Sequence, residues 1–170
     1  MIVTQNRSRA RRLTTRVAAA LAAVTVGLTV GLIGGQPASA ATSGCGSVCD
    51  GKDPDTYIAT VDGKYMRCGY LDNAYTKYTA TYVELRYSTF CRTAWARQTG
   101  SFGYMSGVLV QSFDSSGSLR KQYDNLRTSG SWSAMVNDKG YTARACFYQY
   151  DEEIDQVNDK KHILYCTAKF

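Results

Sequence analysis

Six cysteines constrain this chain more than any other feature of its sequence. All of them lie beyond residue 40 of the 170 residues, at Cys45, Cys49, Cys68, Cys91, Cys146 and Cys166. An even number of cysteines in a small exported domain indicates three disulfides. A zinc site is the alternative, but Cys45 and Cys49 have no second close pair of Cys or His to complete four ligands. We therefore expect disulfides, no metal and no cofactor.

Residues 1–40 have the three-part plan of a secretory signal peptide. Five arginines and no acid precede an apolar run from Val17 to about Ile33, and Ala38-Ser39-Ala40 follows Pro37. This predicts cleavage after Ala40, a secreted, extracellular location and one domain over residues 41–170. An uncleaved anchor is the alternative, because about seventeen apolar residues are marginal for spanning a membrane. The export route stays open, since Arg11-Arg12 only weakly matches a twin-arginine signal.

The formal charge of +6 belongs to the leader. Of the 20 Lys and Arg, five lie in the first forty residues, which leaves 15 against 14 Asp and Glu, a balance of +1. A protein that binds nucleic acid or an anionic membrane needs a basic surface on its folded domain. We therefore expect no nucleic acid and, after cleavage, no membrane as partner. The oligomeric state is not predicted.

The pattern beyond residue 40 predicts an all-β fold, a small antiparallel sandwich or partly open barrel. Turn signals recur every eight to twelve residues between short runs rich in β-branched and aromatic residues. Asp62-Gly63 is a two-residue hairpin signal, because a type I′ turn requires positive φ. Four hairpins are predicted, joining 57–61 to 64–67, 107–113 to 118–123, 132–136 to 141–150, and 141–150 to 162–170.

Two further segments give local expectations. In the strand 82–87, Val83, Leu85 and Tyr87 should share one face, while Glu84 and Arg86 should face water. Residues 71–79 space their apolar side chains as a helix does, so one short helix is expected there.

The predicted last hairpin also pairs two cysteines. Cys146 and Cys166 are equidistant from the centre of the acidic loop near residue 156, which sets them side by side on adjacent strands. A bond there closes a loop and contributes roughly 3 kcal/mol on the chain-entropy estimate. The other four cysteines should join the N-terminal arm, residues 45–68, to the sheet near Cys91, with their pairing left open.

Several of these segments together resemble the YjfA-like family. The matching segments are 45–54, with its Cys-x3-Cys-Asp-Gly-Lys-Asp-Pro motif, 83–97, with Glu-Leu-Arg-Tyr-Ser and Cys-Arg-Thr-Ala-Trp-Ala-Arg, and 137–146 and 166–168 near the end. The resemblance implies an exported, disulfide-bonded domain of Gram-positive bacteria, with no known reaction or ligand. Thr89 departs from the family pattern, and residues 57–67 look like an insertion.

Acidic clusters and carboxylates give weak candidates for chemistry. Asp50, Asp53 and Asp55, and separately Asp151 to Asp159, could surround calcium. The simpler interpretation is a turn capped by its own Asp side chains for the first group, and a solvated hairpin loop for the second. A glycosidase needs two carboxyls held across a cleft, whereas Glu84 and Arg86 invite a salt bridge. His162 is the only imidazole available to activate a nucleophile. We expect no catalytic residue and no metal ligand.

The tyrosines are the candidate binding residues. Tyr combines a flat apolar ring with a polar tip, which suits saccharide and protein surfaces. The candidates form two groups, Tyr75, Tyr78 and Tyr82, and Tyr148 and Tyr150. The sequence thus predicts a non-catalytic binding or cell-envelope-associated module, whose partner is a cell-wall polymer or another extracellular protein. The alternatives are a proteinase inhibitor or antagonist toxin, and a small secreted hydrolase using carboxylates.

Overall fold

The computed structural model describes residues 42–125 and 131–170. The predicted leader and its cleavage site lie outside these residues. Among the helices of the described part, none is both long and apolar enough to cross a membrane.

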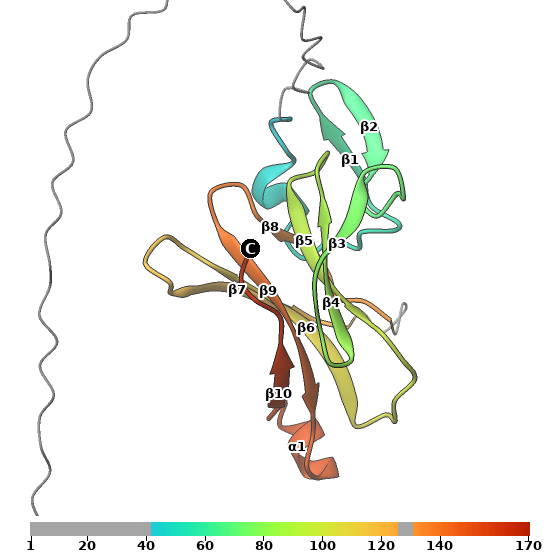
Figure 1. Ribbon diagram of the computed structural model, residues 1–170, viewed down its shortest axis with the longest axis vertical. Helices are drawn as coiled ribbons and strands as arrows, with labels where there is room; N and C mark the ends of the chain where they lie inside the picture. Colours follow the sequence, from blue (N-terminus) through green and yellow to red (C-terminus); the bar gives the residue numbers. More distant parts are fainter. Residues whose placement is uncertain (1–41, 126–130) are drawn as a thin grey trace, which may run out of the picture. The chain divides into compact units, whose positions relative to one another are not determined.

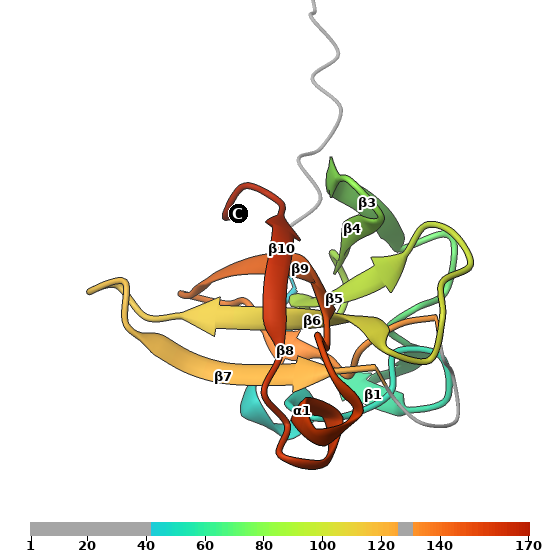
Figure 2. The same ribbon diagram turned by 90° about the horizontal axis from the view of Figure 1, so that it is seen from below.

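Two four-stranded antiparallel sheets form the body of the protein (Figures 1 and 2). The first has the order β3 (Ala74–Ala80), β4 (Val83–Ser88), β5 (Thr93–Gln98) and β8 (Val136–Asn137). The second has the order β10 (His162–Cys166), β9 (Thr142–Gln149), β6 (Ser106–Phe113) and β7 (Leu119–Asp124). The remaining elements are the hairpin β1 (Ile58–Val61) and β2 (Lys64–Arg67), the 3-10 helix η1 (Gly46–Cys49) and the helix α1 (Glu153–Val157).

The inner faces of the two sheets make one core. Val83, Leu85 and Tyr87 point inward from β4, as their alternation predicts. Val108 and Val110 of β6 face them, together with Ala143, Ala145 and Phe147 of β9. Because side chains of both sheets bury one another, the fold is a sandwich, which confirms the predicted all-β class.

Three of the four predicted hairpins are confirmed. Asp62 and Gly63 both have positive φ, 50° and 74°, as a type I′ turn requires. The pairs β1–β2, β6–β7 and β9–β10 are antiparallel neighbours. The hairpin from 132–136 into 141–150 is wrong, because β8 pairs with β5 in the first sheet, and residues 138–141 cross over to β9 in the second.

The helix expected over 71–79 is also wrong. Residues 74–80 form β3, which pairs with β4 along its length. Thr76, Thr79 and the tyrosines favour a pleated strand, and pairing with β4 overrides the helical spacing of three apolar residues. The short helix of this fold is α1, inside the acidic loop between β9 and β10.

Three disulfides are present. Cys146 and Cys166 are bonded across the paired strands β9 and β10, which confirms that prediction. Cys68 is bonded to Cys91, so the N-terminal arm is joined to the turn before β5. Cys45 and Cys49 close a small loop around η1.

The N-terminal arm covers part of the outer face of the first sheet. Cys49, Ala59, Val61 and Cys68 of the arm are buried against Trp95 and Met135 in a second core. The arm also exchanges backbone hydrogen bonds with the segment before β8, from the Gly51 amide to the Met135 carbonyl and from the Met135 amide to the Lys52 carbonyl. The prediction of a water-facing Arg86 is therefore wrong, since only 9% of it is exposed.

The crossover between the sheets contains a buried carboxyl group. Asp138 is 8% exposed, and its Oδ1 atom accepts no hydrogen bond within the described residues. Burial raises its pKa from 3.8 to about 7, although the positive charges of Arg92 and Lys77 favour the ionised form. The backbone amide of Asp138 donates to the Arg92 carbonyl, which fixes the carboxyl group in this place.

The raised pKa of Asp138 predicts a pH-dependent stability. The free energy of unfolding should fall as the pH rises from about 4 to 7, because the unfolded chain ionises in this window while the folded protein keeps the proton. Asp138→Asn should remove this dependence and raise stability at pH 8 by at most about 4 kcal/mol. Urea unfolding at pH 4 and pH 8 measures both effects. If the free energies of unfolding of the wild type and Asp138→Asn change equally between pH 4 and pH 8, the prediction is contradicted.

The disulfides should differ in their contributions. Cys146→Ala/Cys166→Ala opens a loop with a sequence separation of 20 and should cost about 3 kcal/mol. Cys45→Ala/Cys49→Ala opens a separation of 4 and should cost about 2 kcal/mol, because the smaller loop restricts the unfolded chain less. Denaturant unfolding of the two double variants gives the comparison, and a larger loss for the second would count against this account.

Candidate functional site

The predicted tyrosines divide into exposed and buried groups. Tyr75 and Tyr78 on β3 are exposed, and so is Tyr82 in the turn between β3 and β4. Tyr148 and Tyr150 are 6% and 7% exposed, with their rings in an edge-to-face contact. The first group therefore keeps ring surface for a partner, whereas the second does not.

Tyr82, in the β3–β4 turn, borders a groove formed with the segment before β6 and with β9 and β10, which we call the edge groove. Its volume is about 390 Å³. Its lining comprises Tyr82, Phe102, Gly103, Met105, Ser106, Phe147, Gln149, Leu164 and Tyr165. No Asp, Glu, Lys or Arg is among these described residues, so the groove offers ring surface and neutral polar groups.

Rings contact one another along the edge groove. The Tyr82 ring centroid lies 4.5 Å from that of Phe102, 5.2 Å from Phe147 and 6.0 Å from Tyr165. These are edge-to-face contacts, which fix ring orientation. Tyr82 is still 42% exposed and Tyr165 44%, so both keep surface for a ligand.

The backbone of Tyr82 is in the left-handed region, at φ 69°. This conformation is rare for a bulky residue and carries a cost of order 1–3 kcal/mol. It is held by the tight β3–β4 turn, whose Tyr82 carbonyl accepts a hydrogen bond from the Thr99 amide at 3.0 Å. This backbone conformation places the Tyr82 ring beside the groove.

Tyr75 and Tyr78 belong to a separate line of rings. Tyr75 contacts Tyr87, and Tyr78 contacts Phe170, which also packs on Tyr87 at 4.9 Å. The Lys77 ammonium group lies 4.0 Å from the Phe170 ring centroid. These contacts secure the last residue of the chain beside β3 and leave the outer faces of both tyrosines exposed.

Tyr148 and Tyr150 enclose a buried ammonium group. The Lys161 side chain is 7% exposed, 3.0 Å from Asp124 and also paired with Asp159. The Tyr150 hydroxyl donates to Asp159 at 3.0 Å, and burial raises the pKa of Tyr148 far above its ordinary value. This cluster ties the acidic loop to β7 and β9.

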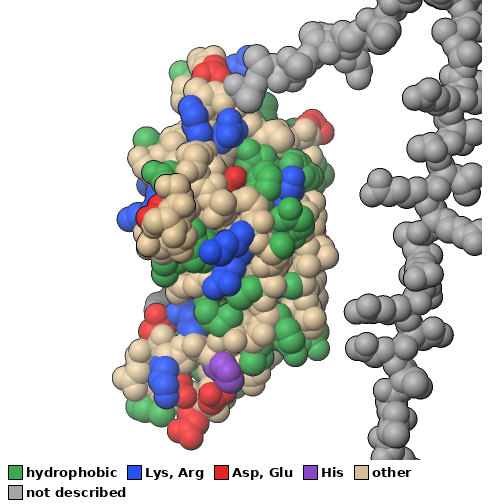
Figure 3. All heavy atoms as spheres, turned by 60° about the vertical axis from the view of Figure 1, so that its left-hand side comes forward, with side chains coloured by type: hydrophobic (Ala, Val, Ile, Leu, Met, Phe, Trp, Pro, Cys, Tyr) green, Lys and Arg blue, Asp and Glu red, His purple; other side chains and the backbone are tan. Residues whose placement is uncertain are grey.

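The acidic segments are used within the fold. Asp50 accepts hydrogen bonds from Arg120 at 2.7 and 3.0 Å and from the Asn137 amide at 2.7 Å, while Asp53 accepts from the Asp55 amide at 2.8 Å. In the loop 151–159, Asp151 lies 3.4 Å from His162, which Figure 3 shows beside acidic side chains. Asp53 thus caps its own turn, whereas Asp50 joins the N-terminal arm to distant strands.

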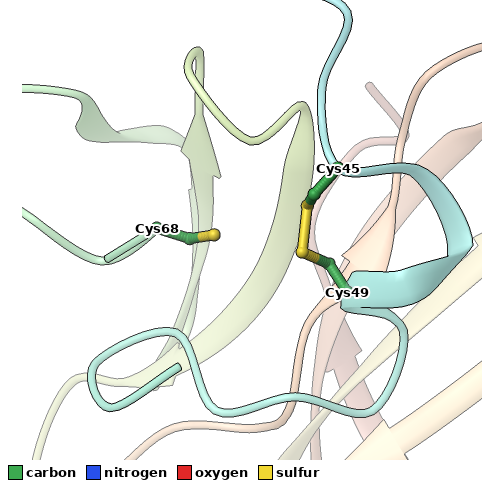
Figure 4. Close-up of side chains that lie close together, drawn as sticks. All are labelled: Cys45, Cys49 and Cys68. Carbon is green, nitrogen blue, oxygen red and sulfur yellow. A yellow bond between two sulfur atoms is a disulfide. The ribbon is translucent and has the colours of Figure 1, made fainter. Parts of the chain in front are cut away.

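The sulfur atoms of Cys45, Cys49 and Cys68 lie within 4.8 Å of one another. Figure 4 shows the Cys68 sulfur pointing toward the Cys45–Cys49 disulfide. A metal ion would need thiolates, and each of these sulfurs is bonded to another cysteine. The three sulfurs therefore belong to two separate disulfides that pack together in the second core.

A second concave site is present that was not predicted from the sequence. We call it the Trp–Arg pocket, a cavity of about 240 Å³ lined by Pro54, Asp55, Gly69, Leu71, Arg86, Trp95, Arg97 and Trp132. It lies where the N-terminal arm meets the outer face of the first sheet. Alternation along β4 and β5 places Arg86 and Trp95 on one face as register partners. No local signal brings Asp55 and Trp132 to them, because these residues are far away in the sequence.

Comparison with known proteins gives a family. No curated protein and no solved structure matches the chain significantly. A family model, described as protein of unknown function (DUF2690), matches residues 47–146. The matched range contains every residue that lines the Trp–Arg pocket and more than half of the chain. The chain therefore belongs to the DUF2690 family of proteins of unknown function.

Proposed function

We propose that this protein is an exported, non-catalytic binding module whose edge groove holds uncharged sugar units of a cell-wall polymer. We also propose that it is a YjfA-like protein of a Gram-positive bacterium and that it acts outside the cell after its leader is removed. The observation that carries it is the ring-lined, charge-free groove over which strained Tyr82 is held.

The chemistry of the groove favours a neutral saccharide. Sugar rings present apolar C–H faces that pack on aromatic side chains, and Tyr82, Phe102 and Tyr165 supply such surface. Ser106 and Gln149 add neutral hydrogen-bonding groups that could fix orientation. A charged polymer would find no counter-charge among the groove's described lining residues.

Two observations support a non-catalytic role. A glycosidase needs a pair of carboxyl groups about 5 to 9 Å apart, and the described lining of the edge groove includes none. Glu84 is engaged elsewhere, since it accepts two hydrogen bonds from Arg97, at 3.0 and 2.6 Å. A partner protein in the same groove is the competing occupant, and the experiment below separates it from a polymer.

Tyr82→Gly tests the groove without adding strain. Glycine adopts positive φ readily, so relief of backbone strain should offset much of the stability lost with the ring contacts, and the variant should fold. Retention on purified cell-wall glycans should fall about tenfold, as expected when a contact worth about 1.4 kcal/mol is lost. Tyr165→Ala should act in the same direction. Pull-down on peptidoglycan and on neutral wall polysaccharides is the measurement.

Tyr65→Ala is the matched control. Tyr65 is 75% exposed on β2 and lies outside the groove lining, so its loss should leave retention unchanged. Wild-type retention no better than that of Tyr82→Gly would refute the proposal. Binding to an extracellular protein but to no glycan would assign the groove to a protein partner instead.

A further inference from the structure

We propose that the Trp–Arg pocket is a second binding site, which takes a sugar unit bearing a carboxylate group. The site is independent of the edge groove, because the two cavities share no lining residue. Its occupant follows from a buried cation without a direct ion pair, a half-buried indole ring and a rigid wall.

Arg86 is a buried cation that forms no direct salt bridge within the described residues, and the Glu84 carboxylate reaches it only through Thr76. Its Nη1 atom donates to Thr76 Oγ1 at 2.8 Å, and its Nη2 atom to the Ala74 carbonyl at 3.0 Å. Both acceptors are neutral, although buried charges are ordinarily paired with an opposite charge. Burial, followed by the nearby Arg97, lowers the pKa of Arg86, although the Glu84 carboxylate acts in the opposite direction. An anion in the pocket would remove this electrostatic cost.

The inner wall of the pocket, formed by Arg86 and Arg97 together with Glu84, carries one positive unit, which the exposed Asp55 of the lining offsets. Glu84 is bound to Arg97 and also accepts a hydrogen bond from the Thr76 hydroxyl at 3.0 Å. One carboxylate thus serves two guanidinium groups, Arg97 directly and Arg86 through Thr76. A ligand with a single negative charge matches the inner wall without Asp55, whereas a phosphate monoester would exceed even that charge.

Asp55 is the remaining charged group of the lining, and it is exposed. Its backbone amide bonds to Asp53, while its carboxylate forms no ion pair within the described part of the chain. A carboxylate ligand would be repelled by Asp55. Neutralising Asp55 should therefore strengthen binding, an effect opposite to that expected for a neutral sugar that bonds to it.

The other walls are flat and apolar. Trp95 is 4% exposed and forms the back of the pocket, whereas Trp132 is half-buried, keeps ring surface for a ligand and donates from its indole nitrogen to Asp53 at 3.4 Å. Indole rings pack against the C–H faces of a sugar ring. A volume of about 240 Å³ is below the roughly 300–1,000 Å³ of drug-sized pockets, which suits one sugar unit.

The arm side of the pocket is held by backbone contact. The Gly69 amide donates to the Pro54 carbonyl at 2.6 Å, directly after the cysteine bonded to Cys91. A Cβ atom at position 69 would lie 2.9 Å from that carbonyl oxygen, so only glycine permits this approach. The wall is therefore formed before any ligand binds, which reduces the entropic cost of binding.

The test uses an oligomer of glucuronic acid and its uncharged methyl ester as probes. Titration of the protein, followed by calorimetry and tryptophan fluorescence, should show the acid binding at least tenfold more tightly than the ester. Arg86→Gln should weaken binding of the acid at least tenfold, and Asp55→Asn should strengthen it severalfold. Arg67→Gln, which removes one exposed positive charge on β2, is the matched control and should change neither.

Three results would each count against a carboxylate-bearing sugar in the Trp–Arg pocket. Equal binding of acid and ester, no binding of the acid, or weaker binding by Asp55→Asn would overturn the proposal. Inorganic phosphate that competes as well as the acid would reduce the site to a general anion site. If Arg86→Gln does not fold, the ester and Asp55→Asn still give the answer. Tyr82→Gly should leave glucuronate binding unchanged, so failure here is distinct from failure of the edge groove.

Discussion

The bond between Cys68 and Cys91 is the constraint on which both the second core and the Trp–Arg pocket depend. A sandwich of two sheets buries its inner faces without help, but its outer faces would ordinarily meet water. Here the bond holds the N-terminal arm over the outer face of the first sheet. Trp95 and Met135 are buried as a result, and Arg86 with them. The unusual electrostatics of Arg86 thus follow from a covalent link 23 residues in span.

The two concave sites arise at different junctions and have different chemistry. The edge groove lies between the two sheets and is lined by rings and neutral polar groups. The Trp–Arg pocket lies between the arm and the first sheet and contains two guanidinium groups. A polymer with both neutral and carboxylate-bearing sugars is one substance that could use both sites.

Local patterns predicted the parts of the fold that depend on local chemistry. Asp62-Gly63 fixed a turn by its φ preference, and the symmetric placement of Cys146 and Cys166 about one loop identified their bond. The predictions of a helix at 71–79 and of a hairpin turn at 137–140 were wrong, because the structure of these segments depends on pairing with other strands. The same turn residues occur where a chain folds back to pair with the preceding strand and where it crosses to the other sheet.

The candidate sites were harder to predict. Tyr82 was named from its residue type, but its strained backbone and its ring contacts appear only when two sheets meet. Arg86 was predicted to face solvent, because the alternation of side chains along a strand shows on which face of the sheet Arg86 lies. The alternation does not show which other segment covers that face. The cover comes from residues 45–73, which pack through a disulfide whose pairing the sequence left open.

Amide hydrogen exchange on Cys68→Ala/Cys91→Ala tests most directly whether this bond holds the arm on the sheet. The account predicts that the amides of Gly51, Gly69 and Met135 lose protection, while those of β6 and β9 in the sandwich core stay protected. Unchanged protection of the arm amides, or equal loss across arm and sandwich core, would contradict it.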